Sequence, residues 1–366
     1  MKEYLSTLIR NQNRLNNDEL YVREILNKHL SNIKNKKLYK YRACSNRNFE
    51  ILSQNEIWFS QASAFDDAFD CTLNIDFKQN GNKLKQWCRT DMLRFIYDLT
   101  ESKIKQHGVQ QPFGQDVFVE CVNYCVTANG ELDYDKYMEC IEKYLPLESL
   151  DKFKEIFPII KAQMKEQQCR LDELAKETEK VTQQQRIASR DRMWVYSMAT
   201  DYNVATLWEN YAGKYTGFCI EYSFGDFERY PFDDYKKLLY LFPIIYRSNK
   251  PAFDLVPGIN NFLEGKIYGS ENPVEEFEIQ VYTNLQMYYK SRDYAFEQEW
   301  RLVLDGARGN RQKFPFVSAI YVGKDIKLGN YRRLKNIAKM LEIPIYKQII
   351  NKSNNGFQYV LEEGTK

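Results

Sequence analysis

The chain has 366 residues, enough for two domains or for one core with an insertion, and 43% hydrophobic with 28% charged residues excludes a disordered chain. Its 52 basic and 50 acidic side chains give a formal net charge of +2, which excludes general electrostatic capture of nucleic acid or of an anionic membrane. Eight cysteines without a CxxC pair and only two histidines, His29 and His107, disfavour structural zinc and any mechanism that needs a histidine base.

The N-terminal stretch MKEYLSTLIRNQNRL lacks a sustained apolar run and a small-residue cleavage site. No window approaches the roughly 18 consecutive apolar residues that span a bilayer. We therefore expect a cytoplasmic protein without a membrane partner. Most cysteines lie inside apolar runs, so all eight thiols are expected to be reduced.

Helices and strands alternate in the first 80 residues. Apolar stripes predict helices over residues 1–34, and β-branched and aromatic residues then predict strands. The predicted elements are a strand at 38–42 (LYKYR), a short helix at 46–53, a strand at 56–60 (EIWFS), an acidic turn at 61–70 and a strand at 71–77.

Residues 82–190 change to long segments with a period of 3.6 residues. From Leu150 to Val181 apolar side chains recur about every 3.5 residues, which favours a long antiparallel helical hairpin. We interpret this segment as a helical insertion that splits the β-core and offers a surface for a protein partner.

Strand character returns at 193–200 and recurs to the end of the chain. The other predicted strands are 216–224, 239–248, 299–304, 319–323, 344–350 and 357–362, with helices at 204–213, 273–292 and 329–341. This order predicts an α+β fold with a mixed, largely antiparallel β-core interrupted by a large helical insertion. The expected domains are an N-terminal helical segment at 1–37, a core of 38–80 and 193–366, and the insertion at 82–190.

The first candidate site follows two of the early strands. Arg42 ends one strand, Ser60 ends the next, and Asp66, Asp67 and Asp70 come within ten residues of Ser60. Closely spaced acids repel one another, so they would bind a cation, hold a ribose or pair with a basic residue such as Arg42. The alternative is a turn cap at Asp66 and solvated side chains after it.

The second candidate is LWENYAGKYTGFCIEY, residues 207–222, a helix that turns into a strand. Gly213 and Gly217 punctuate the turn, where a glycine caps a helix or lets the backbone approach a ligand. Capping is the commoner role. Trp208 and Tyr211 are expected to lie mainly in the core.

The third candidate is YAFEQEWRLVL, residues 294–304. In an extended chain alternate side chains share a face about 7 Å apart, which would place Phe296, Trp300, Leu302 and Leu304 toward the core. Glu297, Glu299 and Arg301 would then project together from the other face. The alternative is a solvated ladder of charges.

These blocks, LYKYR, WFS with FDDAFD, LWENYAGKYTGFCIEY and FEQEWR, together resemble a bacterial family catalogued only as a domain of unknown function. Ala68 stands where that family usually has proline. Members are suspected of roles in conflict with phage or mobile elements, so the resemblance implies an effector in bacterial defence.

Arg42, Ser60 and the pair Glu297 and Glu299 are also similar to the Arg–Ser–Glu signature of ADP-ribosyltransferases. In those enzymes the arginine grips the NAD pyrophosphate, the serine braces the last glutamate, and that glutamate holds the nicotinamide ribose. The likeness implies NAD, with catalytic roles for Glu299, Glu297 and Ser60 and binding roles for Arg42, Asp67, Asp70, Trp58 and Arg301. We expect one cleft to hold these residues, with Trp58 and Trp208 near its wall, and Glu299→Gln to abolish activity without unfolding the chain.

Two alternatives remain open. In a metal-dependent nuclease or phosphodiesterase, Asp67, Asp70, Glu221 and Glu299 would hold Mg²⁺. Basic side chains of the helical segment would then contact nucleic acid: Lys161, Lys165, Arg170, Arg186, Arg190 and Arg192. In the other alternative the chain is a non-catalytic sensor or scaffold whose helical arm binds a partner.

Overall fold

The computed structural model describes residues 1–65, 67, 70–72, 74, 133–144, 147–251, 281, 284–305, 310–351 and 356–361, with a few isolated positions between 98 and 127. The chain divides into two compact units. Unit 1 comprises Met1–Asn74, Arg186–Pro251 and Gln280–Lys366, and unit 2 comprises Ile75–Gln185 and Ala252–Ile279. The domain boundaries expected from the sequence stay a prediction.

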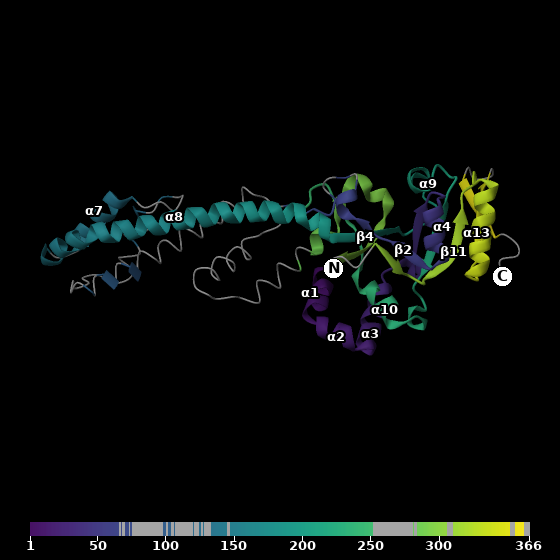
Figure 1. Ribbon diagram of the computed structural model, residues 1–366, viewed down its shortest axis with the longest axis horizontal. Coiled ribbons are helices and arrows are strands. Elements are labelled where there is room, and N and C mark those ends of the chain that lie inside the picture. Colours follow the sequence, from purple (N-terminus) through teal and green to yellow (C-terminus); the bar gives the residue numbers. More distant parts are fainter. Residues whose placement is uncertain are drawn as a thin grey trace. The chain divides into compact units, whose positions relative to one another are not determined.

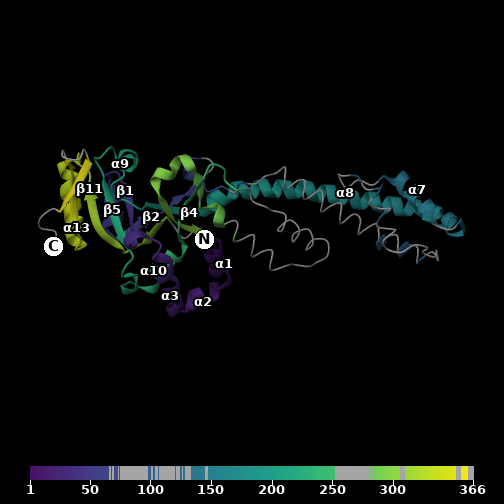
Figure 2. The ribbon, with the colours of Figure 1, turned by 180° about the vertical axis from the view of Figure 1, so that it is seen from behind.

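Unit 1 is built on a nine-stranded sheet, which Figures 1 and 2 show from opposite sides. Its strands are β1 (Lys37–Arg42), β3 (Ser60–Gln61), β4 (Met193–Ala199), β5 (Phe218–Ser223), β6 (Leu241–Pro243), β9 (Glu299–Asp305), β11 (Val317–Val322), β12 (Ile345–Asn351) and β13 (Gly356–Leu361). The order is β13-β12-β11-β5-β1-β4-β9-β6, with β3 beside β4. Only the β11–β12 pair of this sheet is parallel, so the predicted α+β class with a mixed, largely antiparallel core is confirmed.

Two small sheets accompany the large one. An antiparallel pair joins β2 (Glu56–Trp58) to β10 (Arg311–Lys313). A parallel pair joins β7 (Ile245–Arg247) to β8 (Tyr289–Ser291). The second pair corrects the sequence analysis, which predicted helix through residues 289–291.

Seven α-helices among the described residues lie wholly within unit 1. They are α1 (Lys2–Arg10), α2 (Gln12–Asn17), α3 (Glu19–Leu30), α4 (Asn46–Ser53), α9 (Ala205–Tyr211), α10 (Phe232–Tyr235) and α13 (Leu328–Met340), with short 3₁₀ helices η1 (Lys34–Lys36), η2 (Ala62–Ala64), η3 (Phe227–Arg229) and η4 (Lys236–Tyr240). Asp18 caps α3 and Ser45 caps α4, each accepting a backbone N–H of the first turn. His29 on α3 is buried against Tyr4 and the Leu241 carbonyl, so it belongs to the core.

Unit 2 contains α7 (Tyr134–Tyr144), and most of α8 (Leu147–Arg192) lies in it. Tyr137 stacks on Phe157 with ring centroids 6.1 Å apart, and Lys154 lies 2.9 Å from Glu142. Both contacts join positions on either side of the short link between the helices, so α7 and α8 form an antiparallel hairpin. Residues 150–181, where the hairpin was expected, belong to one continuous helix of 46 residues.

The segment before β9 differs from the extended chain that alternation predicted. Arg292–Glu297 forms a 3₁₀ helix, η5, and Gln298 adopts a left-handed conformation with φ of 43° before the strand begins at Glu299. Phe296 is 39% exposed instead of buried in the core. Glu297 therefore reaches its position from a turn of helix and not from the strand face.

Two further expectations concern membranes and cysteines. Nowhere in the described parts of the chain is a helix long and apolar enough to cross a bilayer. Of the eight cysteines, those that the structure describes are free thiols: Cys44, Cys71, Cys125, Cys140, Cys169 and Cys219. Cys88 and Cys121, like most of the predicted strand 71–77, lie outside the described residues.

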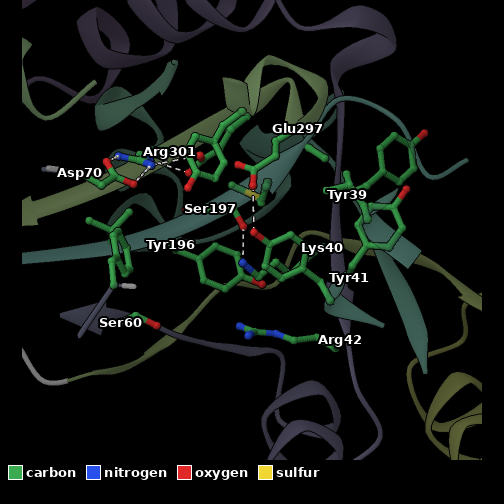
Figure 3. Close-up of a pocket in the computed structure, with 18 of the residues that line it drawn as sticks. Tyr39, Lys40, Tyr41, Arg42, Ser60, Asp70, Tyr196, Ser197, Glu297 and Arg301 are labelled. Carbon is green, nitrogen blue, oxygen red and sulfur yellow. Dashed lines mark hydrogen bonds and ion pairs between the residues drawn. The ribbon is translucent and has the colours of Figure 1, made fainter. Parts of the chain in front are cut away.

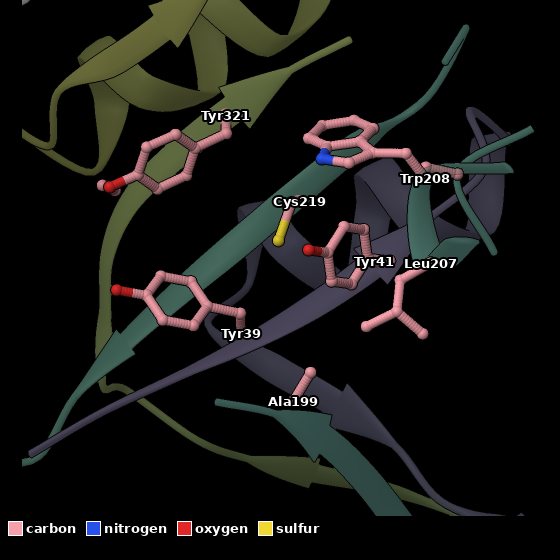
Figure 4. Packing of buried hydrophobic residues seen from close by; sticks show 9 residues of the cluster. Tyr39, Tyr41, Ala199, Leu207, Trp208, Cys219 and Tyr321 are labelled. Atoms are coloured by element: carbon pink, nitrogen blue, oxygen red, sulfur yellow. The ribbon is translucent and has the colours of Figure 1, made fainter. Parts of the chain in front are cut away.

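One face of the large sheet carries an aromatic cluster beneath α9 (Figure 4). Trp208 is fully buried there, its ring edge-on to Tyr41 at 5.3 Å between centroids. Cys219 and Ala199 complete the packing with Tyr39 and Tyr321. Trp208 is thus core, as expected.

The sheet opens between β1 and β4. These strands share one pair, Tyr39 with Ala199, whereas β1 pairs with β5 along its whole length and β4 with β9 over seven residues. Beyond Tyr39 the two strands separate, which leaves backbone polar groups and side chains at the gap free to face a cavity.

Candidate functional site

A pocket of about 560 Å³ lies in unit 1 where β1 and β4 separate (Figure 3). Residues 39–43 of one segment and 195–199 of the other both line it. Its remaining walls come from α4, β2, β3, β8, η5, α9 and β9, and from the acidic turn. Small-molecule sites in proteins commonly have volumes of about 300 to 1,000 Å³. The pocket is therefore large enough for a nucleotide-sized ligand.

The eight residues expected to have catalytic or binding roles all line this pocket: Arg42, Trp58, Ser60, Asp67, Asp70, Glu297, Glu299 and Arg301. They come from chain segments that are far apart in the sequence. Their catalytic and binding roles stay predictions. Trp208, expected near the wall, does not line the pocket, and Asp66 lies outside the described residues.

Arg301 holds two of the acids in a buried ion network. Its Nε atom donates to Glu299 Oε1 at 2.5 Å, and its Nη2 atom donates to Glu299 Oε2 at 3.1 Å and to Asp70 Oδ2 at 2.6 Å. Its Nη1 atom donates to Asp70 Oδ1 at 2.6 Å and to the Met287 carbonyl at 3.2 Å. Every N–H group of the guanidinium thus has an acceptor, which offsets the cost of burying the charge.

Lys290 joins the same network from β8. Its Nζ atom lies 2.7 Å from Glu297, 3.2 Å from Glu299 and 3.9 Å from Asp70. Glu297 also accepts a hydrogen bond of 2.8 Å from the Tyr211 hydroxyl. Three carboxylates thus surround two cations, and the network carries one net negative charge.

Glu299 is kept ionised by its surroundings. Burial by itself raises the pKa of Glu299, but the charge and hydrogen bonds of Arg301, followed by the charge of Lys290, outweigh burial and hold it well below its usual value. A hydrogen bond from Ser197 acts in the same direction. The carboxylate therefore carries its full negative charge at neutral pH.

The serine beside Glu299 is Ser197, which faces Arg301 across the β4–β9 pair. Ser60 pairs with Val195 on the other side of β4, and within the described residues no hydrogen bond joins its hydroxyl to Glu299. The signature had suggested that Ser60 braces this glutamate, a role that the geometry gives to Ser197.

Arg42 lies on the opposite side of the pocket from the ion network (Figure 3). Its guanidinium carbon is 5.6 Å from the centre of the Tyr196 ring, and no carboxylate of the described residues lies within 4.0 Å. Of the acids expected as its partners, Asp70 pairs instead with Arg301. Arg42 is therefore a cation of the pocket whose described side-chain contact is with Tyr196 and not with an acid.

Lys40 is a pocket residue that the sequence analysis missed. Its Nζ atom donates to the Ser197 carbonyl at 2.5 Å and lies 4.9 Å from the centre of the Tyr196 ring. Burial and then the charge of Arg42 lower the pKa of Lys40 to about 7, although Glu299 and Glu297 act in the opposite direction. The signal was present, because alternation in LYKYR places Lys40 on the same face as Arg42.

Two tyrosines complete the site. Tyr211, predicted to lie in the core, is 49% exposed and lines the pocket through its contact with Glu297. Tyr246 accepts a hydrogen bond of 2.8 Å from the Glu299 backbone N–H. Both fix the position of the glutamates.

The four acids expected to hold Mg²⁺ do not come together. Glu221 lies on β5 outside the pocket, where Ser318, Lys37 and Tyr321 bind its carboxylate at 2.7 to 2.9 Å. Asp70 and Glu299 are occupied by Arg301. In the described part of the chain no three His, Cys, Asp or Glu side chains are grouped to bind a metal.

The basic residues assigned to nucleic acid also have other contacts. Lys161 and Lys165 lie 5.0 and 5.9 Å from the Tyr134 ring within the α7–α8 hairpin. Arg190 donates to the carbonyls of Ala62, Phe65 and Asp67, which anchors the acidic turn beside the pocket. The side chain of Arg186 lies outside the described residues.

Comparison with known proteins gives one match. Residues 207–302 match a family described as a protein of unknown function (DUF2971), and this segment includes Tyr211, Glu297, Glu299 and Arg301 of the pocket. No curated protein and no solved structure matches the chain. The segment that supplies both glutamates of the site is therefore similar to a family of unknown function, which agrees with the expected likeness to such a family.

Proposed function

We propose that the pocket binds NAD and that the chain cleaves the bond between nicotinamide and ribose, passing the ADP-ribosyl group to an acceptor. The observation that supports this best is the division of charge across one pocket. Arg42 lies on one side with no carboxylate within 4.0 Å among the residues that the structure describes, and the ionised Glu299 lies on the other within a network of net negative charge.

The Arg42 side of the pocket suits the pyrophosphate. A guanidinium presents paired N–H donors that match phosphate oxygens, and such charged contacts are stronger than neutral ones. Asn48 and Ser60 add polar groups on the same lining, and the ring of Trp58 offers an apolar surface to a base.

The glutamate side suits the reaction. When the C–N bond breaks, its electron pair leaves with nicotinamide and the ribose ring gains positive charge. A carboxylate that is already ionised and immobilised stabilises this charge without reorganising. Arg301, Lys290 and Ser197 occupy Glu299, so we assign to it a purely electrostatic role.

Glu297 has the more open carboxylate. It carries two hydrogen bonds, from Tyr211 and Lys290, and therefore retains acceptor capacity toward a ribose hydroxyl or the acceptor group.

The test measures NAD binding by calorimetry and nicotinamide release by chromatography, with and without EDTA. Release is expected to persist in EDTA. Arg42→Gln should weaken NAD binding by roughly 10- to 100-fold, the equivalent of one charged hydrogen-bonding group. The matched control is Arg229→Gln, which removes the same charge from a side chain that is 70% exposed and outside the pocket, and should leave binding unchanged.

Four results would contradict the proposal. If NAD does not bind at millimolar concentration, NAD is not the substrate. If the Arg42→Gln variant binds NAD with the same affinity as wild type, Arg42 does not contact NAD. Cleavage of nucleic acid that EDTA abolishes would instead identify a metal-dependent nuclease. With neither activity, a non-catalytic sensor or scaffold becomes the better account.

A role in bacterial defence is the biological extension of the proposal. Consumption of NAD would starve an infected cell and stop phage replication. Cells expressing the wild-type chain should yield fewer plaques than cells expressing Arg42→Gln, and equal plaque counts would separate the activity from defence.

A further inference from the structure

The pocket holds two lysines in opposite environments. Lys290 is surrounded by three carboxylates within 3.9 Å, and their charges keep its pKa above the usual value despite burial. Lys40 has no carboxylate within 4.0 Å among the described residues, and its one hydrogen-bond acceptor is the neutral Ser197 carbonyl. Pairs of titratable groups whose environments shift their pKa values in opposite directions are typical of acid–base sites.

Charged groups on every neighbouring element act on Lys40. Arg42 on β1 and Lys290 on β8 disfavour a second ammonium, whereas Glu299 on β9 and Glu297 on η5 favour one. Tyr196 on β4 presents its ring and not an anion. Because burial adds to the two cations, the balance puts the pKa of Lys40 at about 7, where the neutral amine is well populated in a cell.

The geometry also fixes the amine. A neutral amine has two N–H groups and one lone pair, and Lys40 directs one N–H to the Ser197 carbonyl at the gap between β1 and β4. The lone pair of the nitrogen then points away from that carbonyl, and the Lys40 side chain lines the pocket (Figure 3).

We propose that Lys40 is the general base of the site and removes the proton from the acceptor O–H or N–H group as that group bonds to the ribose carbon. The inference rests on the proposed function. The electron pair of the O–H or N–H bond stays on the acceptor atom, that atom forms the new bond to carbon, and nicotinamide leaves with the C–N pair. The proton resides on Lys40 as an ammonium and is released to water, helped by the nearby charge of Arg42.

The first measurement needs no NAD. Competitive acetylation of the intact chain between pH 5 and 10, followed by peptide mass spectrometry, reports the titration of each amine. Lys40 should titrate near pH 7, and Lys339, exposed on α13, serves as the internal reference amine. Titration of Lys40 with the reference lysine would overturn the inference.

The second measurement is the pH profile of nicotinamide release. Wild type should show a rate that rises through pH 7, and Lys40→Met should lose about 100-fold or more together with this rise. Lys40→Arg keeps a positive charge but cannot act as a base at neutral pH, so it should behave like Lys40→Met. Lys339→Met should match wild type, and thermal melting verifies that each variant is folded.

The outcomes separate the two proposals. Wild-type consumption of NAD with an unchanged profile in Lys40→Met contradicts the role of Lys40 and leaves the proposed function standing. No consumption by wild type, even if Lys40 titrates near pH 7, contradicts both. Loss of the rise in both Lys40 variants supports both.

Discussion

Arg301 is the buried cation around which two acids of the pocket, Asp70 and Glu299, are arranged. It is 1% exposed, and each of its N–H groups has an acceptor. Removing one acceptor leaves a buried charge incompletely compensated, which is more costly than losing a surface ion pair. Glu299 is thus a structural residue as well as a candidate functional one. The sequence alone led us to expect that Glu299→Gln would leave folding nearly intact, and the buried network leads us to predict a loss of stability instead.

Glu299→Gln should lower the free energy of unfolding by about 3 to 5 kcal/mol, the usual cost of breaking a buried ion pair on one side. Urea denaturation measures the change. Glu228→Gln, which removes an exposed partner of Arg23, should cost at most about 1 kcal/mol. Equal midpoints for the two variants would show that the network adds no stability.

The difference in unfolding free energy between wild type and Glu299→Gln should also depend on pH. Because the pKa of Glu299 is depressed in the folded chain, its contribution is complete above the unfolded glutamate pKa of about 4.3. It is lost as the pH falls through the lower folded pKa. The difference in unfolding free energy between wild type and Glu299→Gln should therefore shrink below about pH 4.

Among the elements around the pocket, the end of β1 packs closely against one glycine, Gly217. A Cβ atom at Gly217 would overlap the carbonyl oxygens of Arg42 and Ala212, so the turn after α9 packs directly on the residue that faces the pocket. The sequence analysis considered capping or a ligand approach for this glycine. The close approach exists, but the backbone that approaches is that of β1.

Gly217→Ala should destabilise unit 1 by about 1 to 3 kcal/mol, the range for forced overpacking, and should weaken ligand binding by shifting Arg42. Denaturation midpoints and NAD calorimetry measure the two effects. Gly329→Ala on α13 is the control, since a Cβ atom there meets nothing within 4 Å. If both variants behave alike, the contact with β1 is dispensable.

Local patterns in the sequence predicted most element types and eight residues of the pocket, but neither its other lining residues, such as Lys40, nor how the charged residues pair. Alternation placed Glu299 and Arg301 on one face of β9 correctly, because both lie in a regular strand. It failed for Glu297, since the left-handed turn at Gln298 uses a residue that does not signal such a turn. The Asp70–Arg301 pair joins positions 231 residues apart, which no local pattern specifies.

On the scale of the whole molecule, the pocket is assembled from chain segments that unit 2 interrupts. Its strands come from residues 37–42, 193–199 and 299–305, whereas residues 75–185 and 252–279 belong to unit 2. Ligand binding at such a site stabilises the segments that meet there by a free energy that grows with ligand concentration.

Hydrogen–deuterium exchange with saturating NAD should therefore slow in peptides covering β1, β4 and β9. Peptides from α13 and from α7, which do not line the pocket, should exchange as before. The Arg42→Gln variant at the same NAD concentration should lack the effect. Uniform slowing across both units would instead indicate a global change, and no slowing would indicate that NAD does not bind between these strands.

The fully occupied guanidinium of Arg301 also constrains how this chain can diverge. Substituting Asp70 or Glu299 alone leaves buried N–H donors of Arg301 without acceptors. Substituting Arg301 alone leaves two buried carboxylates with Lys290 as their remaining cation. Each single step passes through a poorly folded intermediate, whereas a concerted replacement by apolar residues of similar volume does not. Asp70, Glu299 and Arg301 are therefore expected to be inherited as a block, changing together or not at all.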